Sequence, residues 1–322
     1  MLKRMSIRKI CISSFVLLLL FVLYLIPTNE ISDNELQLKT DGIEYVYPNN
    51  LAVIYLLDSN DYIARTLITS CNCEAKDKAV DLIEGLTIDG KKSNIIPNGF
   101  RSLIPSGTTI KDITLEEGVL TIDFSKELLE INSNYEEKMI ESIIFTRNSI
   151  DGIYKVIIKV EGEVLTNLPH SKKILPTMLD KEYGINKSYE LVSINDIESY
   201  TLYYVNSYND NYYYVPVTKY INNDNQDKIK VIIEELSTSP VYESSLMSFL
   251  NVSTKLLNYE ITDNTLKLNF NNMILNDITS NNILEEVIYT IGLSMGDNLD
   301  VKEVVFMVEN EEIYKFLTKS IE

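Results

Sequence analysis

The residues that could carry out chemistry are few and scattered along the chain. His170 is the single histidine, and it lies between two loop-forming residues, Pro169 and Ser171. A lone histidine in a connector is typically solvated, which disfavours a Ser/His/Asp triad or a histidine-rich zinc site, since both need convergent partners. The sequence therefore predicts no catalytic, cofactor-binding or metal-binding residue, and a protein that is not an enzyme.

Asp123 is the residue most like a catalytic acid. It lies near the end of an alternating strand pattern at 118–124, and Glu127 follows soon after. A second copy of this pattern carries Asn269 at the matching position, and an amide cannot ionise. We therefore interpret Asp123 as a polar residue at a strand end, where a short polar side chain bonds to nearby backbone groups.

Cys71 and Cys73 form a close cysteine pair. Outside a cell membrane two such thiols could oxidise, but a bridge that encloses a single residue is strained, and two ligands alone make a weak metal site. A position before a helix lowers the pKa of a thiol, which leaves a reactive pair open as well. Two neutral thiols are the interpretation that the sequence favours.

A run of tyrosines offers a binding surface instead of a reactive site. Neighbouring residues of a strand face opposite sides, so Tyr203 and Tyr204 cannot both be buried on one core. Exposed tyrosines are favoured at protein interfaces and can stack on sugars; alternatively, they are ordinary strand residues in a chain with 21 tyrosines. The candidate interaction surface consists of Tyr203, Tyr204, Tyr208, Tyr212, Tyr213 and Tyr214.

These residues belong to a chain in which a unit of strand, helix and strand occurs twice. In the first copy, strands at 118–124 and 154–160 alternate apolar and polar residues, which is typical of half-buried strands. Between them, Ser133 and Glu136 have the spacing of a capping box and predict the start of a helix. The residues that predict the buried face of this helix are Ile140, Ile143 and Ile144.

The second copy has its strands at 264–270 and 304–308 and its helix around 284–291. We align Val-Ile-Tyr-Thr at 287–290 with Ile-Ile-Phe-Thr at 143–146. Repetition across elements of both types indicates duplication of one folded module.

A hairpin and a helix precede each copy. The hairpins are predicted at 51–57 with 62–69 and at 201–205 with 212–217, and the helices at 74–86 and 226–236. Periodicity is lost between the two copies. The predicted organisation is an α+β fold with a first module at 51–163, a connector at 164–199 and a second module at 200–316.

The amino terminus predicts a membrane anchor. An apolar run begins at Ile10 and ends at Ile26, and four cations precede it. Residues 1–27 are therefore predicted to form a cytoplasmic end and a transmembrane anchor. The positive-inside bias puts the amino terminus in the cytoplasm and the bulk of the chain outside. A cleaved signal peptide is the alternative, but the small-x-small cleavage pattern is missing. Residues 28–50 are polar and acidic and predict a tether.

The rest of the chain is strongly acidic. The formal net charge is −18 even though four cations precede the apolar run. Such a surface repels nucleic acid and does not adhere electrostatically to anionic lipid. Proteins or neutral glycans are therefore the expected partners.

The order of these patterns resembles the GerM-type sporulation and spore germination proteins, which carry two tandem GerMN domains. The resemblance is carried by residues 104–108, 118–125, 143–146 and 156–162 in the first copy, 266–270, 288–290 and 304–309 in the second, and 179–186 in the connector. Asn271 and Asn310 depart from the first copy, which has Ser125 and Gly162 at those places. The resemblance implies an α+β module related to the ring-building motifs of secretion systems.

The resemblance also implies a role in sporulation. Proteins of this kind lie outside the mother-cell membrane and support the complex that links mother cell and forespore during engulfment, with later effects on cortex and germination. Well-known members are lipoproteins, whereas Cys11 stands at the start of the apolar run and cannot be a lipid-accepting cysteine.

We therefore expect a single-pass membrane protein that acts as a scaffold through other envelope or sporulation-complex proteins. Its membrane contact is the run from Ile10 to Ile26, self-association is left open, and no nucleic acid or cofactor is expected. Two alternatives from other classes are an accessory of a peptidoglycan-acting envelope enzyme and a ligand-sensing ectodomain.

Overall fold

The computed structural model describes residues 50–318, except for 224, 239–243 and 278–280. The predicted anchor at 10–26 lies outside the described residues, as does the tether up to residue 49. Within the described ranges, no helix is both long and apolar enough to cross a membrane. The anchor therefore stays a prediction from the sequence.

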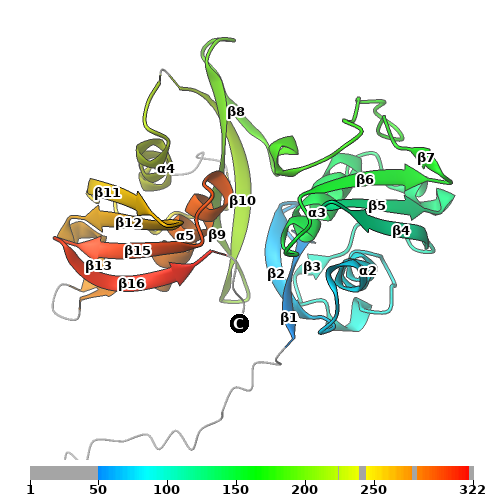
Figure 1. Ribbon diagram of the computed structural model, residues 1–322, viewed down its shortest axis with the longest axis horizontal. Coiled ribbons are helices and arrows are strands. Elements are labelled where there is room, and N and C mark those ends of the chain that lie inside the picture. The colour runs from blue at the N-terminus through cyan, green and yellow to red at the C-terminus, as the bar shows by residue number, and fades with distance from the viewer. Residues whose placement is uncertain (1–49, 224, 239–243, 278–280, 319–322) are drawn as a thin grey trace, which may run out of the picture. The chain divides into compact units, whose positions relative to one another are not determined.

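The first module begins with the predicted hairpin and helix and continues through the strand, helix, strand unit (Figure 1). Its elements are β1 (Leu51–Asp58), β2 (Ile63–Thr69), α2 (Ala75–Gly85), η1 (Ser93–Ile95), β3 (Phe100–Arg101), β4 (Ile110–Glu116), β5 (Val119–Phe124), η2 (Lys126–Glu130), α3 (Glu136–Asn148), β6 (Lys155–Val160) and β7 (Glu163–Val164).

The second module repeats this order with a longer hairpin, and the connector adds a short helix and a short strand before it. Their elements are η3 (Lys181–Tyr183), β8 (Ser188–Glu190), β9 (Ile197–Tyr208), β10 (Asn211–Asn222), α4 (Lys228–Ser237), β11 (Leu256–Thr262), β12 (Thr265–Phe270), η4 (Asn272–Ile274), β13 (Leu275–Asp277), β14 (Asn282–Ile283), α5 (Glu285–Asn298), β15 (Glu303–Val308) and β16 (Glu311–Leu317).

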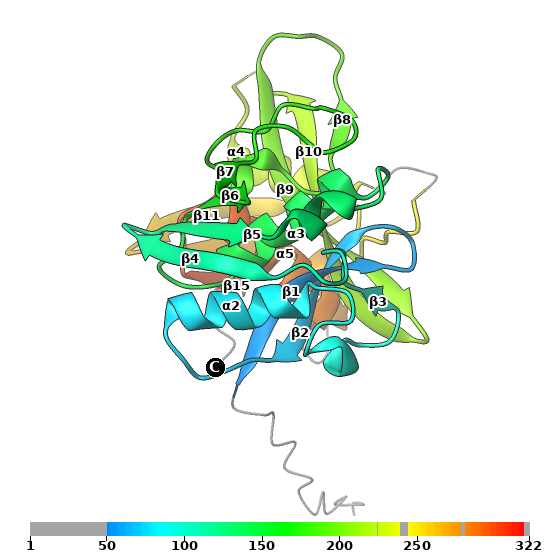
Figure 2. The ribbon, with the colours of Figure 1, turned by 90° about the vertical axis from the view of Figure 1, so that its right-hand side faces the viewer.

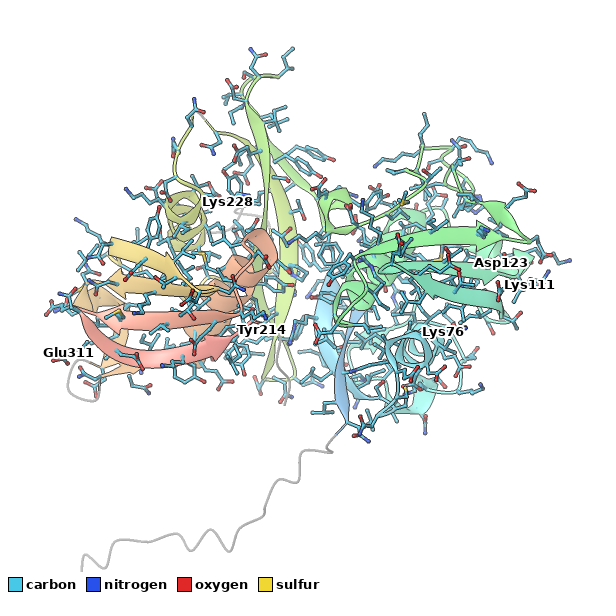
Figure 3. All side chains as sticks on the ribbon, in the orientation of Figure 1. Lys76, Lys111, Asp123, Tyr214, Lys228 and Glu311 are labelled. Carbon is cyan, nitrogen blue, oxygen red and sulfur yellow. A yellow bond between two sulfur atoms is a disulfide. The ribbon has the colours of Figure 1, made fainter. Side chains whose placement is uncertain are left out.

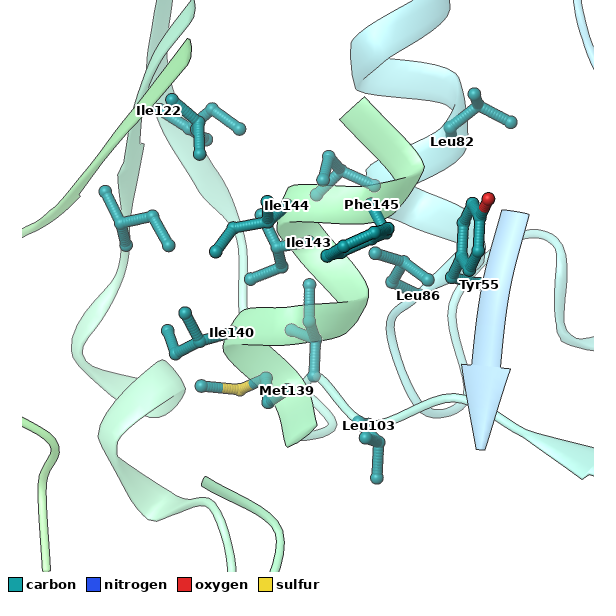
Figure 4. Packing of buried hydrophobic residues seen from close by; sticks show 14 of the residues in the cluster. Tyr55, Leu82, Leu86, Leu103, Ile122, Met139, Ile140, Ile143, Ile144 and Phe145 are labelled. Carbon is teal, nitrogen blue, oxygen red and sulfur yellow. The ribbon is translucent and has the colours of Figure 1, made fainter. Parts of the chain in front are cut away.

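Helix α3 packs on its sheet through the face that the isoleucine spacing predicted. Ile140, Ile143 and Ile144 are fully buried, and Figure 4 shows them beside Ile122 of β5. Strands β5 and β6 pair in parallel, an arrangement that requires a crossover such as α3. On its other side, α3 places the ring of Phe145 5.6 Å from the ring of Tyr55 on β1, so the helix is buried between the sheet and the first hairpin.

The capping box predicted for α3 is wrong. The residue at the N-cap is Tyr135, without a side-chain cap, and no hydrogen bond joins Ser133 to Glu136 among the described contacts. The Glu136 carboxylate instead accepts hydrogen bonds from the backbone N–H groups of His170 and Ser171, at 2.8 and 2.9 Å. Two donors from the connector replace the single donor that a capping box would supply.

Edge strands β4, β11 and β16 were not predicted. Each forms a hairpin with a strand that was predicted, namely β5, β12 and β15. The turns of the first two hairpins have positive φ at both central residues, at Glu117-Gly118 and Asp263-Asn264. Such turns fit the twist of an antiparallel pair, but these sequences lack the Asn-Gly or Asp-Gly pair that would have indicated them.

The helix of each module is hydrogen-bonded to the first hairpin strand of the same module. Thr146 on α3 accepts from the backbone N–H of Tyr55 on β1, and Ser294 on α5 accepts from the backbone N–H of Tyr203 on β9, both at 2.9 Å. Thr290, which the sequence alignment paired with Thr146, bonds to the carbonyl of Glu286 in its own helix. That alignment was therefore wrong by one helical turn, because a shift of four residues preserves an apolar stripe.

The two hairpins meet in one sheet, and the described residues belong to one compact unit. The strand order is β3-β1-β2-β10-β8, with β9 on β10 as well. Strands β2 and β10 share one residue pair, Arg65 with Tyr214. Each module also has a second sheet, β4-β5-β6-β7 in the first and β11-β12-β15-β16 in the second. In the view of Figure 2, α2 and β4 lie near each other in the first module, as their contacts require.

The closest helix packing in the second module predicts the effect of a small substitution. A Cβ atom added to Gly292 on α5 would lie 2.3 Å from the ring of Phe316, which is itself buried. Alanine favours a helix by about 1 kcal/mol over glycine, but forced overlap in a core costs about 1–3 kcal/mol. We expect Gly292→Ala to lower the midpoint of thermal unfolding, and to lower it less in a Phe316→Leu background. Equal effects in both backgrounds would show that the ring is not the cause.

Candidate functional site

The six tyrosines predicted as an interaction surface lie on the β9–β10 hairpin, and most of them are covered. Tyr203 and Tyr204 are each 1% exposed and Tyr213 is 8% exposed, whereas Tyr212 is 52% exposed. Tyr208 and Tyr214 are half-buried. Their use as a surface for another protein stays a prediction, and within this chain they lie mainly at the junction of the two modules.

Tyr203 and Tyr204 are both buried because both faces of the hairpin are covered. The Tyr203 hydroxyl is 2.9 Å from the Tyr55 hydroxyl on β1 of the first module. Tyr204 instead lies near Lys219 of β10 and Glu235 of α4, and burial raises the pKa of Tyr204 to about 12. The two rings do face opposite sides, as neighbours in a strand must, but each side has its own cover.

A chain of hydroxyl groups crosses the junction. The Tyr55 hydroxyl meets that of Tyr203, which donates to the Asp297 carboxylate on α5 at 2.7 Å. Burial, with the nearby carboxylate of Asp297 second, raises the pKa of both tyrosines. Both therefore remain neutral donors at physiological pH, and the second module supplies the terminal acceptor.

Asp58 is the most enclosed carboxylate of the junction, at 1% exposure. One of its oxygens accepts from the backbone N–H groups of Asn60 and Tyr62 in its own hairpin, at 2.9 and 2.7 Å. The other accepts from the Tyr213 hydroxyl at 2.8 Å and from the Asn206 amide at 3.1 Å, both in the second module. A buried charge needs such donors, so Asp58 ties the two modules together.

Asn186 of the connector fills the place where β2 and β10 diverge. Its side chain bonds to both backbone groups of Ile63, at 2.9 and 2.7 Å, and to the carbonyl of Pro216 at 2.7 Å. Its φ of 45° lies in the left-handed region, which asparagine tolerates better than most residues. The Asn186 side chain thus joins β2 and β10 by hydrogen bonds to the backbone of both strands.

Beside Asn186, a partly buried ion pair fastens the connector to α3. The Lys187 ammonium lies 2.6 Å from Glu137 and 2.9 Å from Glu141, and the Glu141 side chain is 4% exposed. Burial raises the pKa of Glu141 although Lys187 is adjacent. Removing one partner of such a pair leaves an uncompensated buried charge.

The sequence missed these junction residues for specific reasons. Asp58 was assigned to a turn and Asn206 lay just beyond the predicted strand at 201–205, and neither position indicated a role because their partners come from the other module. The one signal for Asn186 was the resemblance of residues 179–186 to a segment between GerMN domains. Nothing in the sequence indicated that its side chain would replace strand pairing.

Asp123 and Asn269 occupy equivalent places, as the repeat indicated. Asp123 accepts from the backbone N–H of Gly162 at 2.9 Å, and Asn269 accepts from the backbone N–H of Asn310 at 2.9 Å. Both contacts stabilise the turn that follows the last parallel strand. In Figure 3, Asp123 lies on the first module's sheet and Tyr214 on the β9–β10 hairpin, so the two do not share a site.

His170 and the cysteines have local contacts. The imidazole Nε2 of His170 lies 2.6 Å from the carbonyl of Ile131. Cys71 and Cys73 form a disulfide, where the sequence favoured two free thiols, and their Cα atoms are 5.3 Å apart. In the part of the chain that the structure describes, no cluster of three or more His, Cys, Asp or Glu residues could hold a metal ion.

Comparison with known proteins agrees with this duplicated architecture. The family model "Germane: Sporulation and spore germination" matches residues 53–166 and residues 201–314, more than half of the chain. The chain belongs to this family of GerM-type proteins. It is 32% identical over 266 residues to the "Spore germination protein GerM" of Bacillus subtilis (strain 168), covering 80% of this chain and 71% of the relative.

A solved structure extends the likeness of this GerM-type chain to the arrangement in space. The tandem GerMN domains of the sporulation protein GerM from Bacillus subtilis align with a TM-score of 0.74 at 30% identity. The alignment covers 81% of this chain and 91% of that one. The mixed α+β fold with two tandem GerMN domains is therefore confirmed.

The Asp58 contacts predict which tyrosine of the hairpin stabilises the protein. Tyr213→Phe removes one donor from a buried carboxylate, which costs about 1–2 kcal/mol, and should lower the free energy of unfolding by that amount. Tyr212→Phe is the matched control on the same strand and should change it by less than about 0.5 kcal/mol. Denaturant unfolding of the full chain measures both. Indistinguishable values would contradict the proposed link between the modules.

The shared turn contact of Asp123 and Asn269 predicts a tolerated exchange. Asp123→Asn gives the first module the residue of the second and should leave the free energy of unfolding within about 0.5 kcal/mol of the parent. Asp123→Leu removes the acceptor and should cost about 1 kcal/mol. A parent-like Asp123→Leu protein would show that the contact is unimportant.

Proposed function

We propose that this GerM-type chain is a non-enzymatic scaffold, held at the membrane by residues 10–26, that acts outside the membrane through protein contacts during sporulation. The processes we assign to it are the engulfment complex, cortex formation and later germination. The names of its relatives support sporulation and germination, and the acidic surface supports protein partners over nucleic acid.

The observation that carries the scaffold proposal is the buried polar junction. Domains of one chain commonly move relative to one another unless their interface is extensive. Here a shared sheet, the Asp58 carboxylate, the Tyr55–Tyr203 contact and Asn186 cross the junction together. A protein that must present two sets of partner surfaces at a set spacing benefits from such a joint, whereas a catalyst would need convergent reactive groups.

The membrane topology in this proposal follows from the amino-terminal sequence. Four cations before the apolar run favour a cytoplasmic amino terminus, and residues 28–50 would then separate the GerMN domains from the bilayer. In a sporulating cell both domains of the proposed scaffold would then lie between the mother cell and the forespore. Anchoring confines the scaffold to a surface, which raises the frequency of encounter with other membrane proteins.

Deletion of the gene tests the scaffold function. We expect fewer heat-resistant spores and defective engulfment, with vegetative growth unchanged, because the partners are present only during sporulation. The intact gene supplied in trans is the control and should restore spore yield, as should the Asp123→Asn chain, since no catalysis is assigned to that carboxylate. Normal engulfment and normal spores from the deletion strain would reject the proposal.

A further inference from the structure

The loop between β8 and β9 is the most exposed apolar feature of the described residues that is continuous in sequence. Val192 is 94% exposed and Ile194 is 91% exposed, and Leu191 and Ile197 are 39% and 42% exposed. Figures 1 and 2 both show this loop extending past the neighbouring strands. We refer to Leu191, Val192, Ile194 and Ile197 as the apolar tip.

The apolar tip is held in place by a polar side chain. Asn222 at the end of β10 accepts from the backbone N–H groups of Val192 and Ser193, at 2.8 and 3.1 Å. Its amide donates to the carbonyls of Ser193 and Asn195, at 3.0 and 2.6 Å. Since Asn222 satisfies the backbone of the loop, the apolar side chains are left to face outward. A surface ordered in advance loses less conformational entropy on binding.

Carboxylates outnumber cations around the apolar tip, and Lys228 of α4 is an exposed cation near Glu198. Residues 188–198 contain Glu190, Asp196 and Glu198 but neither lysine nor arginine. Hydrogen bonds from Tyr200 and Asn223 lower the pKa of Glu198, which therefore remains charged. The nearest lysine from β10, Lys219, is 6% exposed and already paired with two glutamates.

A shallow hollow of about 250 Å³ adjoins the tip. Apolar side chains of Val192, Ile221 and Val231 form part of its wall. Glu190, Glu234 and Glu235 also line it, and Glu234 is exposed. The hollow therefore has room for an apolar side chain and has carboxylates in its lining.

We propose that the apolar tip and this hollow form the docking surface for a protein segment that carries exposed apolar side chains flanked by lysine or arginine. This inference rests on the proposed scaffold function and names the partner chemistry. Interfaces commonly combine an apolar centre with a charged rim, and complementary charge steers association. A second copy of this chain would bring like charges together, and an anionic membrane would repel the same carboxylates.

The first test uses the full chain in phosphatidylcholine vesicles, with a photoreactive phenylalanine derivative in place of Ile194. The probe is a synthetic peptide of alternating leucine and lysine, and an equally long peptide of alternating leucine and glutamate is its control. Adducts to the lysine peptide alone support the proposal. Adducts to lipid, to a second copy, to both peptides equally, or to nothing would overturn it.

The second test measures the affinity of the lysine peptide for variants of the full chain. Val192→Ser with Ile194→Ser should weaken binding about tenfold or more, because central apolar side chains supply much of the binding free energy. The matched control replaces two other strongly exposed apolar residues, Ile174→Ser with Val252→Ser, which are 79% and 78% exposed, and should bind as the parent does. Equal weakening by both pairs, or by neither, would contradict a site at the tip.

Spore yield separates failure of this inference from failure of the scaffold function. If deletion lowers the yield and the Val192→Ser, Ile194→Ser chain restores it fully, the tip is rejected and the scaffold stands. If deletion has no effect, the scaffold fails, and the peptide measurements still decide whether the tip binds. Loss of yield with the tip variant, but not with the Ile174→Ser, Val252→Ser control, supports both.

Discussion

The two modules depend on one buried charge at their junction. The Asp58 carboxylate is almost without contact with solvent, and it takes two of its donors from its own hairpin and two from the second module. An isolated carboxylate in such a place would be costly, so the first hairpin is satisfied only when the second is docked against it. This makes the junction part of the fold and gives the chain two domains that share a sheet.

The same physical solution appears within each module. A helix covers a parallel pair of strands with its apolar face. A hydroxyl group on the helix, that of Thr146 in one copy and of Ser294 in the other, accepts a hydrogen bond from the backbone of the first hairpin. Asp123 and Asn269 likewise hold equivalent turns with different side chains. What duplication has kept is the geometry of donors and acceptors, and the residue type can vary wherever the contact survives. The repeat therefore preserves the contacts that hold each module together.

The junction and the apolar tip assign different tasks to one hairpin. The β9–β10 strands contribute Tyr203 and Tyr213 to the interior contact between modules, so those rings are largely unavailable to another protein. At the far end, Asn222 orders a loop whose apolar side chains have no cover in the described structure. A single long hairpin can thus stabilise the chain at one place and offer a binding surface at another, because its strands extend beyond the junction.

The sequence by itself determined the duplicated α+β module, the apolar face of α3 and the structural role of Asp123, because these follow from local periodicity and from comparing two copies. It could not predict that Tyr203 and Tyr204 are both buried, because both faces of the hairpin are covered by segments distant in sequence. Tyr55, which covers Tyr203, is 148 residues away. Nor could it fix the helix alignment in the second copy, where a one-turn shift keeps the same stripe. Only the tertiary structure decided those contacts, because burial and pairing across the junction join segments that no local pattern relates.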